Sequence, residues 1–345
     1  AANDTDSIQL IAATGEVNEI RHLISNRDLQ IFTASNELFV PTFLGNAITP
    51  TNAQLRKQTP YGSEWIRPES LDGATIFVQK NGAIVREYLY SDSENSYTSS
   101  SISSISSHLI KTPIEQTALR GAINRNESYL FVTNNDGTIA VFNSNRTEKR
   151  AGWVEFTTQG SFKSVVAIDD KVFCNIVIDT GAGTQKIILC EFKDTVNLDV
   201  AKTYTSTTGS FSVSSEFANG AIVSVISNTN YYGDVVVGSG NADVSSVEAI
   251  TTAEIGYKFD VTLKTNPLEL NTDTGPVTGL PRAVSVNNTA LTIRQVTDDM
   301  SKIRTPVTGK KEFRLLGYSN DPQIEITQSE PLPIQVNGLV AEVII

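Results

Sequence analysis

The chain has 345 residues, of which 39% are apolar and 8% aromatic, and it carries 38 acidic against 27 basic residues. A chain of this length divides into two or three domains with cores of their own, because ordinary domains hold roughly 100–200 residues. The formal charge of −11 argues against a protein that grips DNA, the apolar content argues against disorder, and no apolar run approaches the roughly 20 residues that cross a bilayer.

Three segments in the first half have the pattern of β-hairpins. Each pairs two short runs of β-branched and aromatic residues around a polar turn: residues 29–33 with 38–40, 75–79 with 83–90, and 129–133 with 138–142. In the second, Asn81-Gly82 supplies the positive φ that a tight turn requires. Their spacing of roughly 45–55 residues predicts a radial repeat of small sheets.

Two further predictions concern the same half. Residues 97–110 predict its one helix, because Ile102, Ile105 and Leu109 recur with helical spacing. Residues 152–157, 162–168, 171–178 and 185–192 predict four consecutive strands of one antiparallel sheet, the size of a propeller blade.

Cys174 and Cys190 are the only cysteines. If residues 179–184 turn a hairpin, the two lie opposite each other on adjacent strands. So low a cysteine content is typical of a protein that folds in a reducing cytoplasm, and we expect two buried thiols.

The second half begins where the composition becomes polar. Residues 203–209 (TYTSTTG) are the best linker candidate, and residues 211–253 predict a small β-domain. Beyond them, five short runs and a final hairpin through Asn337-Gly338 predict a β-sandwich; the runs are 257–263, 282–286, 290–294, 311–316 and 324–328. The predicted fold is therefore all-β, with a partial or open β-propeller over residues 1–202, a small β-domain or insertion over 203–255, and a C-terminal β-sandwich over 256–345.

The sequence contains little that points to catalysis. His22 and His108 are the only histidines, and packing or capping explains both better than chemistry. The acid pairs Asp169-Asp170 and Asp298-Asp299 are typical of solvated turns. Phosphate-loop, nucleophile-elbow and zinc-helix motifs are missing, and the glycine-rich residues 180–185 lie between two strands, as a hairpin loop does. We therefore predict no enzyme, no catalytic residue, no cofactor and no metal site.

Ordered motifs give the chain a resemblance to a known family. The sequence ATIFVQKNG at 74–82, VRE at 85–87, Tyr90, Tyr97 and His108-Leu109 resemble the most recognisable segment of the tail nozzle family of short-tailed bacteriophages, also called tail tubular protein B. Other pieces follow in the family's order: residues 29–33, 48–50, 58–62, 136–137, Trp153, 158–160, 261–265, Gly317 before Ile324, and 331–333. The similarity spans most of the chain.

The resemblance implies a structural virion protein of the phage tail, assembled in the host cytoplasm. It implies a homo-hexameric tube that contacts the tail adaptor ring and the tail fibres or spikes, and that closes and then opens for double-stranded DNA. The family's N-terminal region is not recognisable before Ile8, so the resemblance implies the distal part. An acidic wall agrees with passage of DNA, because it binds phosphate weakly. We expect a gate loop within residues 227–241, which are rich in glycine and polar side chains.

Two other functions stay open. The first is a carbohydrate-binding, receptor-recognition domain of a phage tail protein, which requires exposed aromatic residues on one face. The second is a glycan depolymerase, which requires two carboxylates roughly 5–9 Å apart in a groove.

Overall fold

The structure, a computed structural model, is all-β throughout the residues that it describes. These are residues 7–11, 18–42, 47–122, 125–179, 185–265, 270–272, 275–277, 289–292 and 324–334. The chain divides into two compact units, residues 1–179 with 184–192, and residues 180–183 with 193–345.

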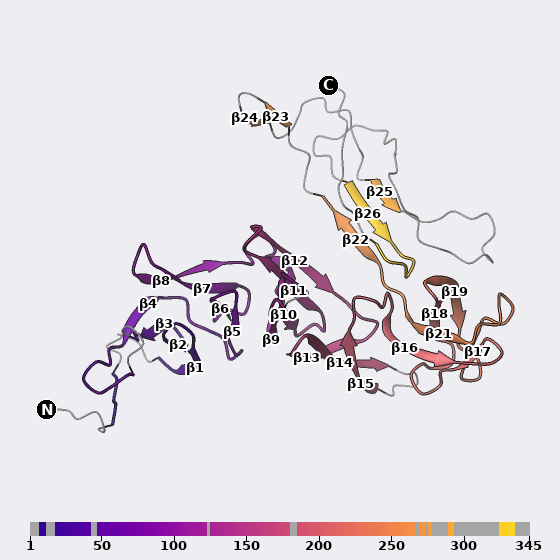
Figure 1. Ribbon diagram of the computed structural model, residues 1–345, viewed down its shortest axis with the longest axis horizontal. Helices are drawn as coiled ribbons and strands as arrows, with labels where there is room; N and C mark the ends of the chain where they lie inside the picture. The colour runs from indigo at the N-terminus through magenta and orange to yellow at the C-terminus, as the bar shows by residue number, and fades with distance from the viewer. Residues whose placement is uncertain are drawn as a thin grey trace. The chain divides into compact units, whose positions relative to one another are not determined.

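The first unit consists of four antiparallel sheets that follow one another along the chain (Figure 1). In each sheet the strands pair in sequence order, which makes every sheet a meander. Sheet 1 holds β1 (Ile20–Ser25), β2 (Leu29–Thr33), β3 (Glu37–Val40) and β4 (Arg56–Thr59), and sheet 2 holds β5 (Glu69–Leu71), β6 (Ala74–Val78), β7 (Val85–Ser91) and β8 (Ser96–Ser101). Sheet 3 holds β9 (Pro113–Leu119), β10 (Ser128–Asn134), β11 (Ile139–Asn145) and β12 (Arg150–Phe156), and sheet 4 holds β13 (Ser161–Ile168), β14 (Lys171–Asp179) and β15 (Gln185–Phe192).

All three predicted hairpins are confirmed. They are β2–β3, β6–β7 and β10–β11, each antiparallel. At the turn between β6 and β7, Gly82 has a φ of 65°, and its N–H donates to the Gln79 carbonyl at 2.8 Å. The local turn chemistry thus sets the register of this pair.

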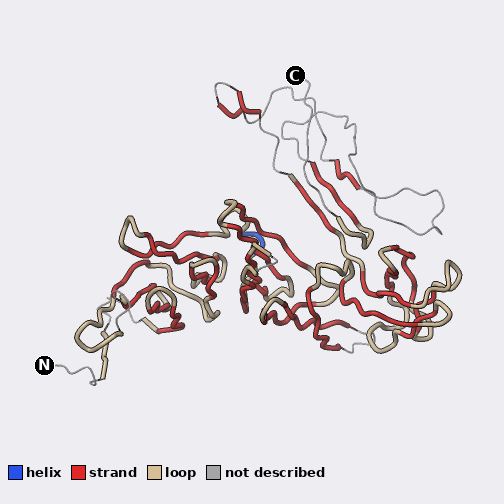
Figure 2. Tube along the Cα trace, in the orientation of Figure 1, coloured by secondary structure: helices blue, strands red, loops and turns tan. Residues whose placement is uncertain are grey.

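The helix predicted over residues 97–110 is wrong. Residues 96–101 form β8, and only Ser107–Leu109 make one turn of 3-10 helix, the short blue segment in Figure 2. The Tyr97 ring is 5% exposed and stacks on Tyr88 with ring centroids 4.6 Å apart, a contact that requires an extended strand beside β7. Serine is a weak helix former, so this tertiary contact decides the conformation.

The grouping of residues 152–192 into one sheet is also wrong. β12 pairs with β11 and closes sheet 3, whereas β13, β14 and β15 form a sheet of three strands. Gly160 follows the end of sheet 3, and a Cβ there would lie 2.2 Å from the Val177 carbonyl oxygen. The chain changes sheets at a position where only glycine fits.

The predicted placement of the cysteines is confirmed, since Cys174 on β14 lies directly opposite Cys190 on β15. The expectation of two buried thiols holds for Cys174 but not for Cys190, which is half-buried. Residues 180–184 of the glycine-rich loop lie outside the described residues.

Strand β6 of sheet 2 is buried on both faces. Phe77 on β6 packs with Phe32 of sheet 1, while Ile76 and Val78 pack with Leu130 and its neighbours in sheet 3. Successive side chains of a strand point to opposite faces, so the side chains of a strand between two neighbours are apolar or find a polar partner. All residues of β6 are buried and only Thr75 is polar; its hydroxyl donates to Gln30 Oε1 at 2.6 Å.

In the described part of the second unit there are a four-stranded sheet and three smaller sheets. The four-stranded sheet has the order β16 (Asp199–Thr205), β21 (Thr252–Tyr257), β18 (Ile222–Ser227) and β19 (Asn230–Val236), and β17 (Ser210–Ser212) pairs with β20 (Asn241–Asp243). One cluster of buried apolar residues, among them Phe211, Val223 and Ile255, forms its core. The small β-domain predicted for residues 211–253 therefore consists of strands, but its sheet also takes in β16.

Two predictions for this region need correction. Residues 203–205 belong to β16, which pairs with β21, so they are part of the sheet and not a linker. β19 lies in the middle of residues 227–241 and pairs along its length with β18, so the expected gate loop contains the second strand of a hairpin.

The C-terminal strands are described in part. β22 (Val261–Lys264) pairs antiparallel with β26 (Ile324–Gln328), which pairs in parallel with β25 (Thr289–Thr292); β23 (Leu270–Thr272) and β24 (Gly275–Val277) form a separate pair. Residues 282–286, Asp298-Asp299, 311–316, Gly317 and the hairpin through Asn337-Gly338 lie outside the described residues.

Candidate functional site

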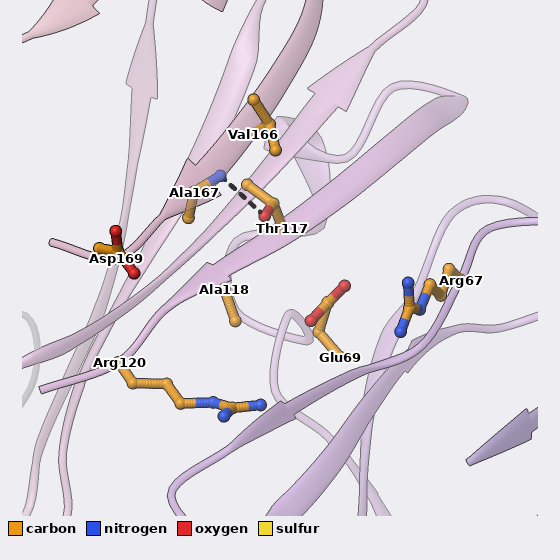
Figure 3. A pocket seen from close by; sticks show the side chains of 8 residues that line it. All are labelled: Arg67, Glu69, Thr117, Ala118, Arg120, Val166, Ala167 and Asp169. Atoms are coloured by element: carbon orange, nitrogen blue, oxygen red, sulfur yellow. Dashed lines mark hydrogen bonds between the residues drawn. The ribbon is translucent and has the colours of Figure 1, made fainter. Parts of the chain in front are cut away.

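One cavity of the first unit lies beside the first strands of three successive sheets. It has a volume of about 450 Å³ and is bordered by β5, β9 and β13 together with the turns next to them (Figure 3). We name it the inter-sheet pocket; its lining residues are Arg67, Glu69, Thr117, Ala118, Arg120, Val166, Ala167 and Asp169.

Side chains of β9 fix the position of these sheets relative to one another. The Gln116 amide donates to the carbonyls of Arg67 at 2.9 Å and Ile76 at 3.0 Å, both in or next to sheet 2. On the side of sheet 4, the Ala167 N–H donates to Thr117 Oγ1 at 3.1 Å, the contact dashed in Figure 3, and the Val165 N–H donates to Glu115 at 3.1 Å. These side chains bond main-chain N–H and C=O groups, in the way that a neighbouring strand would. The bonds hold the residues around the pocket in fixed positions.

The pocket contains charges of both signs. Glu69 extends between the arginines Arg67 and Arg120 in Figure 3, and Asp169 lies at the turn between β13 and β14. Burial raises the pKa of the Glu69 carboxyl, and the nearby positive charges of Arg67 and Arg120 oppose that shift. Two guanidinium groups and two carboxylates leave the pocket formally neutral near pH 7.

Glu69 and Arg67 keep their polar atoms available. Among the described residues, neither side chain makes a hydrogen bond or an ion pair within contact distance, although Arg120 Nε donates to the Ser70 carbonyl at 3.2 Å. Glu69 is half-buried, whereas Arg67 is exposed. A half-buried carboxylate held close to two guanidinium groups without bonding either is unusual, because such groups normally pair directly.

A second, smaller cavity lies between sheets 1 and 2. Its volume is about 200 Å³, and its lining includes Arg27, Tyr90 and Tyr97. The Arg27 guanidinium lies 3.6 Å from the centroid of the Tyr90 ring and pairs with Asp92 at 3.0 Å. Its cation is therefore already engaged, and we consider the inter-sheet pocket the better candidate.

Of the described histidines and acid pairs singled out in the sequence, only Asp169 contributes a side chain to the pocket. His22 lies on β1, where its Nε2 is 3.1 Å from the Glu64 carbonyl and burial lowers its pKa. His108 lies in the 3-10 turn. Asp169 and Asp170 form the tight turn between β13 and β14, as expected, and Asp169 borders the pocket.

Sequence reasoning missed Glu69, Arg67 and Arg120. Arg67 and Glu69 are 2 positions apart and Arg120 lies 51 positions beyond Glu69. They carry no recognisable motif, since they come together only when the start of β5 lies beside the end of β9. Within the part of the chain that the structure describes, no group of three or more potential metal ligands comes together.

The comparisons with known proteins identify no family. No family model matches the chain, and no curated protein sequence does. Among solved structures, the chain is similar to a crystal structure of a triple arginine-to-alanine mutant of AofleA from Arthrobotrys oligospora. The TM-score is 0.29 and the identity 8%, over 88% of this chain and 85% of that chain. So low a TM-score does not establish a shared fold, and no function is transferred from it. Among the described residues, no helix is both long and apolar enough to cross a membrane.

Proposed function

We propose that this chain is a structural, non-enzymatic protein of the virion, a nozzle subunit at the tail tip of a short-tailed bacteriophage. It would be assembled in the host cytoplasm as part of a homo-hexameric tube, between the tail adaptor ring and the attached fibres or spikes. The observation that carries the proposal is the role of the residues that resemble the family. Those whose contacts the structure describes form turns or join neighbouring sheets.

The VRE segment on β7 is the clearest case. Arg86 Nε donates to Gln79 at 2.7 Å, and its guanidinium lies 3.4 Å from the centroid of the Tyr61 ring. Glu87 forms an ion pair with Arg146, which follows β11, and so connects sheet 2 with sheet 3. These contacts join neighbouring sheets of the first unit, which supports a structural role for the residues of the resemblance.

The glycine of the segment QTPYG acts in the same way. Gly62 has a φ of 69°, and a Cβ there would lie 2.4 Å from the Ala34 carbonyl oxygen. Any other residue would force apart the turn of sheet 1 and the segment that leads to sheet 2. The motif thus has a packing reason that does not involve chemistry.

The arrangement of the sheets supports an open β-propeller as the form of the first unit. Four meanders follow one another, and β6 of sheet 2 packs on sheet 1 with one face and on sheet 3 with the other, as a strand of a blade does. For the C-terminal region we propose a β-sandwich, of which β22, β26 and β25 would form one sheet. A net charge of −11 supports a lumen through which DNA passes with weak contacts.

The experiment is to locate the chain in particles. Antibodies raised against the full chain should label one end of purified tailed virions in immunogold electron microscopy, and mass spectrometry of those virions should detect its peptides. A chain absent from purified virions, or present on capsid faces instead of the tail, would contradict the proposal.

The alternatives differ from this proposal in measurable ways. A carbohydrate-binding domain of a tail protein requires a sugar site, for which the inter-sheet pocket is the candidate. A glycan depolymerase would release reducing ends from a host polysaccharide, and an assay for reducing sugars separates it from both.

A further inference from the structure

We propose that the inter-sheet pocket binds a neutral, polyhydroxylated ligand, a sugar residue, between the Glu69 carboxylate and the guanidinium groups of Arg67 and Arg120. The proposal does not rest on the tail role, because the wall of a tube and a receptor-binding domain could each carry such a site. It concerns residues of one compact unit alone.

The charges of the pocket's side chains balance one another. A phosphate or carboxylate ligand would be attracted by Arg67 and Arg120 but repelled by Glu69 and Asp169, and a cation would meet the opposite conflict. A neutral ligand meets neither conflict. The balance of two positive and two negative side chains around one cavity therefore favours a ligand without net charge.

The pocket offers both hydrogen-bond donors and a hydrogen-bond acceptor. Guanidinium groups only donate and an ionised carboxylate only accepts, whereas a hydroxyl does both. Adjacent hydroxyls of a sugar ring can thus donate to Glu69 while accepting from an arginine. The polar atoms of Glu69 and Arg67 are available for this, since they make no direct bond to each other or to other described residues.

The size and the apolar lining of the pocket also fit a sugar. A volume of about 450 Å³ lies within the usual range for small-molecule sites, and it accommodates one or two sugar rings. Ala118, Val166 and Ala167 supply apolar surface of the kind that contacts the C–H face of a ring, and Val166 is 45% exposed. The frame is fixed by the bonds of Gln116 and Thr117, so that little ordering is needed on binding.

None of the eight lining side chains is aromatic, so the ring-stacking contribution common in strong sugar sites is missing here. We accordingly expect a dissociation constant of roughly 1 mM for a single sugar. Several copies in one assembly would raise the apparent affinity for a polysaccharide.

The test uses the full chain and the methyl glycosides of glucose, mannose, galactose, fucose and N-acetylglucosamine, with sodium phosphate as the anionic probe. Binding is measured by saturation-transfer difference NMR and titration. We expect at least one glycoside to bind, and Glu69→Gln to weaken it about tenfold, because a charged acceptor is lost. Arg67→Gln should also weaken it; its exposed guanidinium has no described partner, so folding should be preserved.

Glu94→Gln, in the exposed turn between β7 and β8, is the matched control and should bind as the unaltered chain does. Thermal unfolding of each variant separates lost binding from lost folding. The proposal is overturned if no glycoside binds at 50-fold its expected dissociation constant of roughly 1 mM, or if Glu69→Gln binds as well as the control. It is also overturned if phosphate binds in place of sugars and binds more tightly to Glu69→Gln, which would make the pocket an anion site. None of these outcomes alters the location of the chain in virions, so the two proposals fail separately.

Discussion

The contact between sheets 1 and 2 and the inter-sheet pocket are two places where neighbouring meanders meet, and they are filled in different ways. Between sheets 1 and 2, a cluster of aromatic rings packs closely and the cavity beside it is smaller, about 200 Å³; the rings are those of Phe32, Phe39, Phe77, Tyr88 and Tyr97. At the pocket, charged and small side chains leave a cavity of about 450 Å³. The same sheet architecture therefore supports stability at one place and leaves room for a ligand at the other.

The largest expected effect is at the aromatic contact. Phe77 is fully buried, and its ring centroid lies 5.0 Å from that of Phe32. Phe77→Ala removes this packing and leaves a cavity, so it should lower the free energy of unfolding by about 3–5 kcal/mol, measured by urea denaturation. Phe259→Ala, at a side chain 40% exposed, is the control. A loss below about 1 kcal/mol would show that the cluster does not hold the two sheets together.

A smaller loss is expected where a polar side chain frames the pocket. Gln116→Leu keeps the approximate volume but removes both donors to the carbonyls of Arg67 and Ile76. The free energy of unfolding should fall by about 1–3 kcal/mol, the usual cost of buried polar groups left without partners. The exposed Gln185→Leu should change it little. Equal effects of the two substitutions would contradict a framing role for Gln116.

Glu37 lies beside the aromatic cluster and should have the opposite effect when changed. It is fully buried; its Oε2 accepts from Thr59 at 2.5 Å, whereas its Oε1 has no described partner. Desolvation raises the pKa of this carboxyl, so its protonated form favours the folded state. Its contribution is then fully present below the ordinary pKa near 4.5 and is lost as the pH rises through the raised value.

Glu37→Gln should therefore stabilise the fold at pH 7 by roughly 1 kcal/mol, and the gain should shrink as the pH falls toward 4. Urea denaturation at several pH values measures this difference. Glu94→Gln, which is exposed, should show no such trend. A gain that stays constant with pH would mean that the carboxyl is not the cause.

The smallest expected effect on stability is at Glu69. Its carboxylate bonds no described residue, so Glu69→Gln should change the free energy of unfolding by no more than about 0.5 kcal/mol while it weakens sugar binding. A large loss of stability on this substitution would show that Glu69 stabilises the fold around the pocket. The pocket would then not differ in this respect from the aromatic contact between sheets 1 and 2.

Much of the strand pattern is predictable from the sequence. The hairpins β2–β3, β6–β7 and β10–β11 follow from turn residues and flanking apolar runs, and so does the opposition of Cys174 and Cys190. These features are local, because turn geometry sets the register of a hairpin.

The candidate site was not predictable in this way. Arg67, Glu69 and Arg120 belong to two sheets, and their approach depends on how β5 and β9 pack. Tertiary contacts also decided that residues 96–101 are a strand against β7 rather than a helix, and that β12 closes sheet 3 rather than opening sheet 4.

The sequence by itself determined the all-β class, most strands of the first unit and the tight turns that join them, since each depends on neighbours a few residues apart. The tertiary structure alone decided which strands share a sheet and which charged side chains meet in the inter-sheet pocket. Those outcomes depend on packing between segments roughly 50 residues apart, for which the sequence carries no local signal.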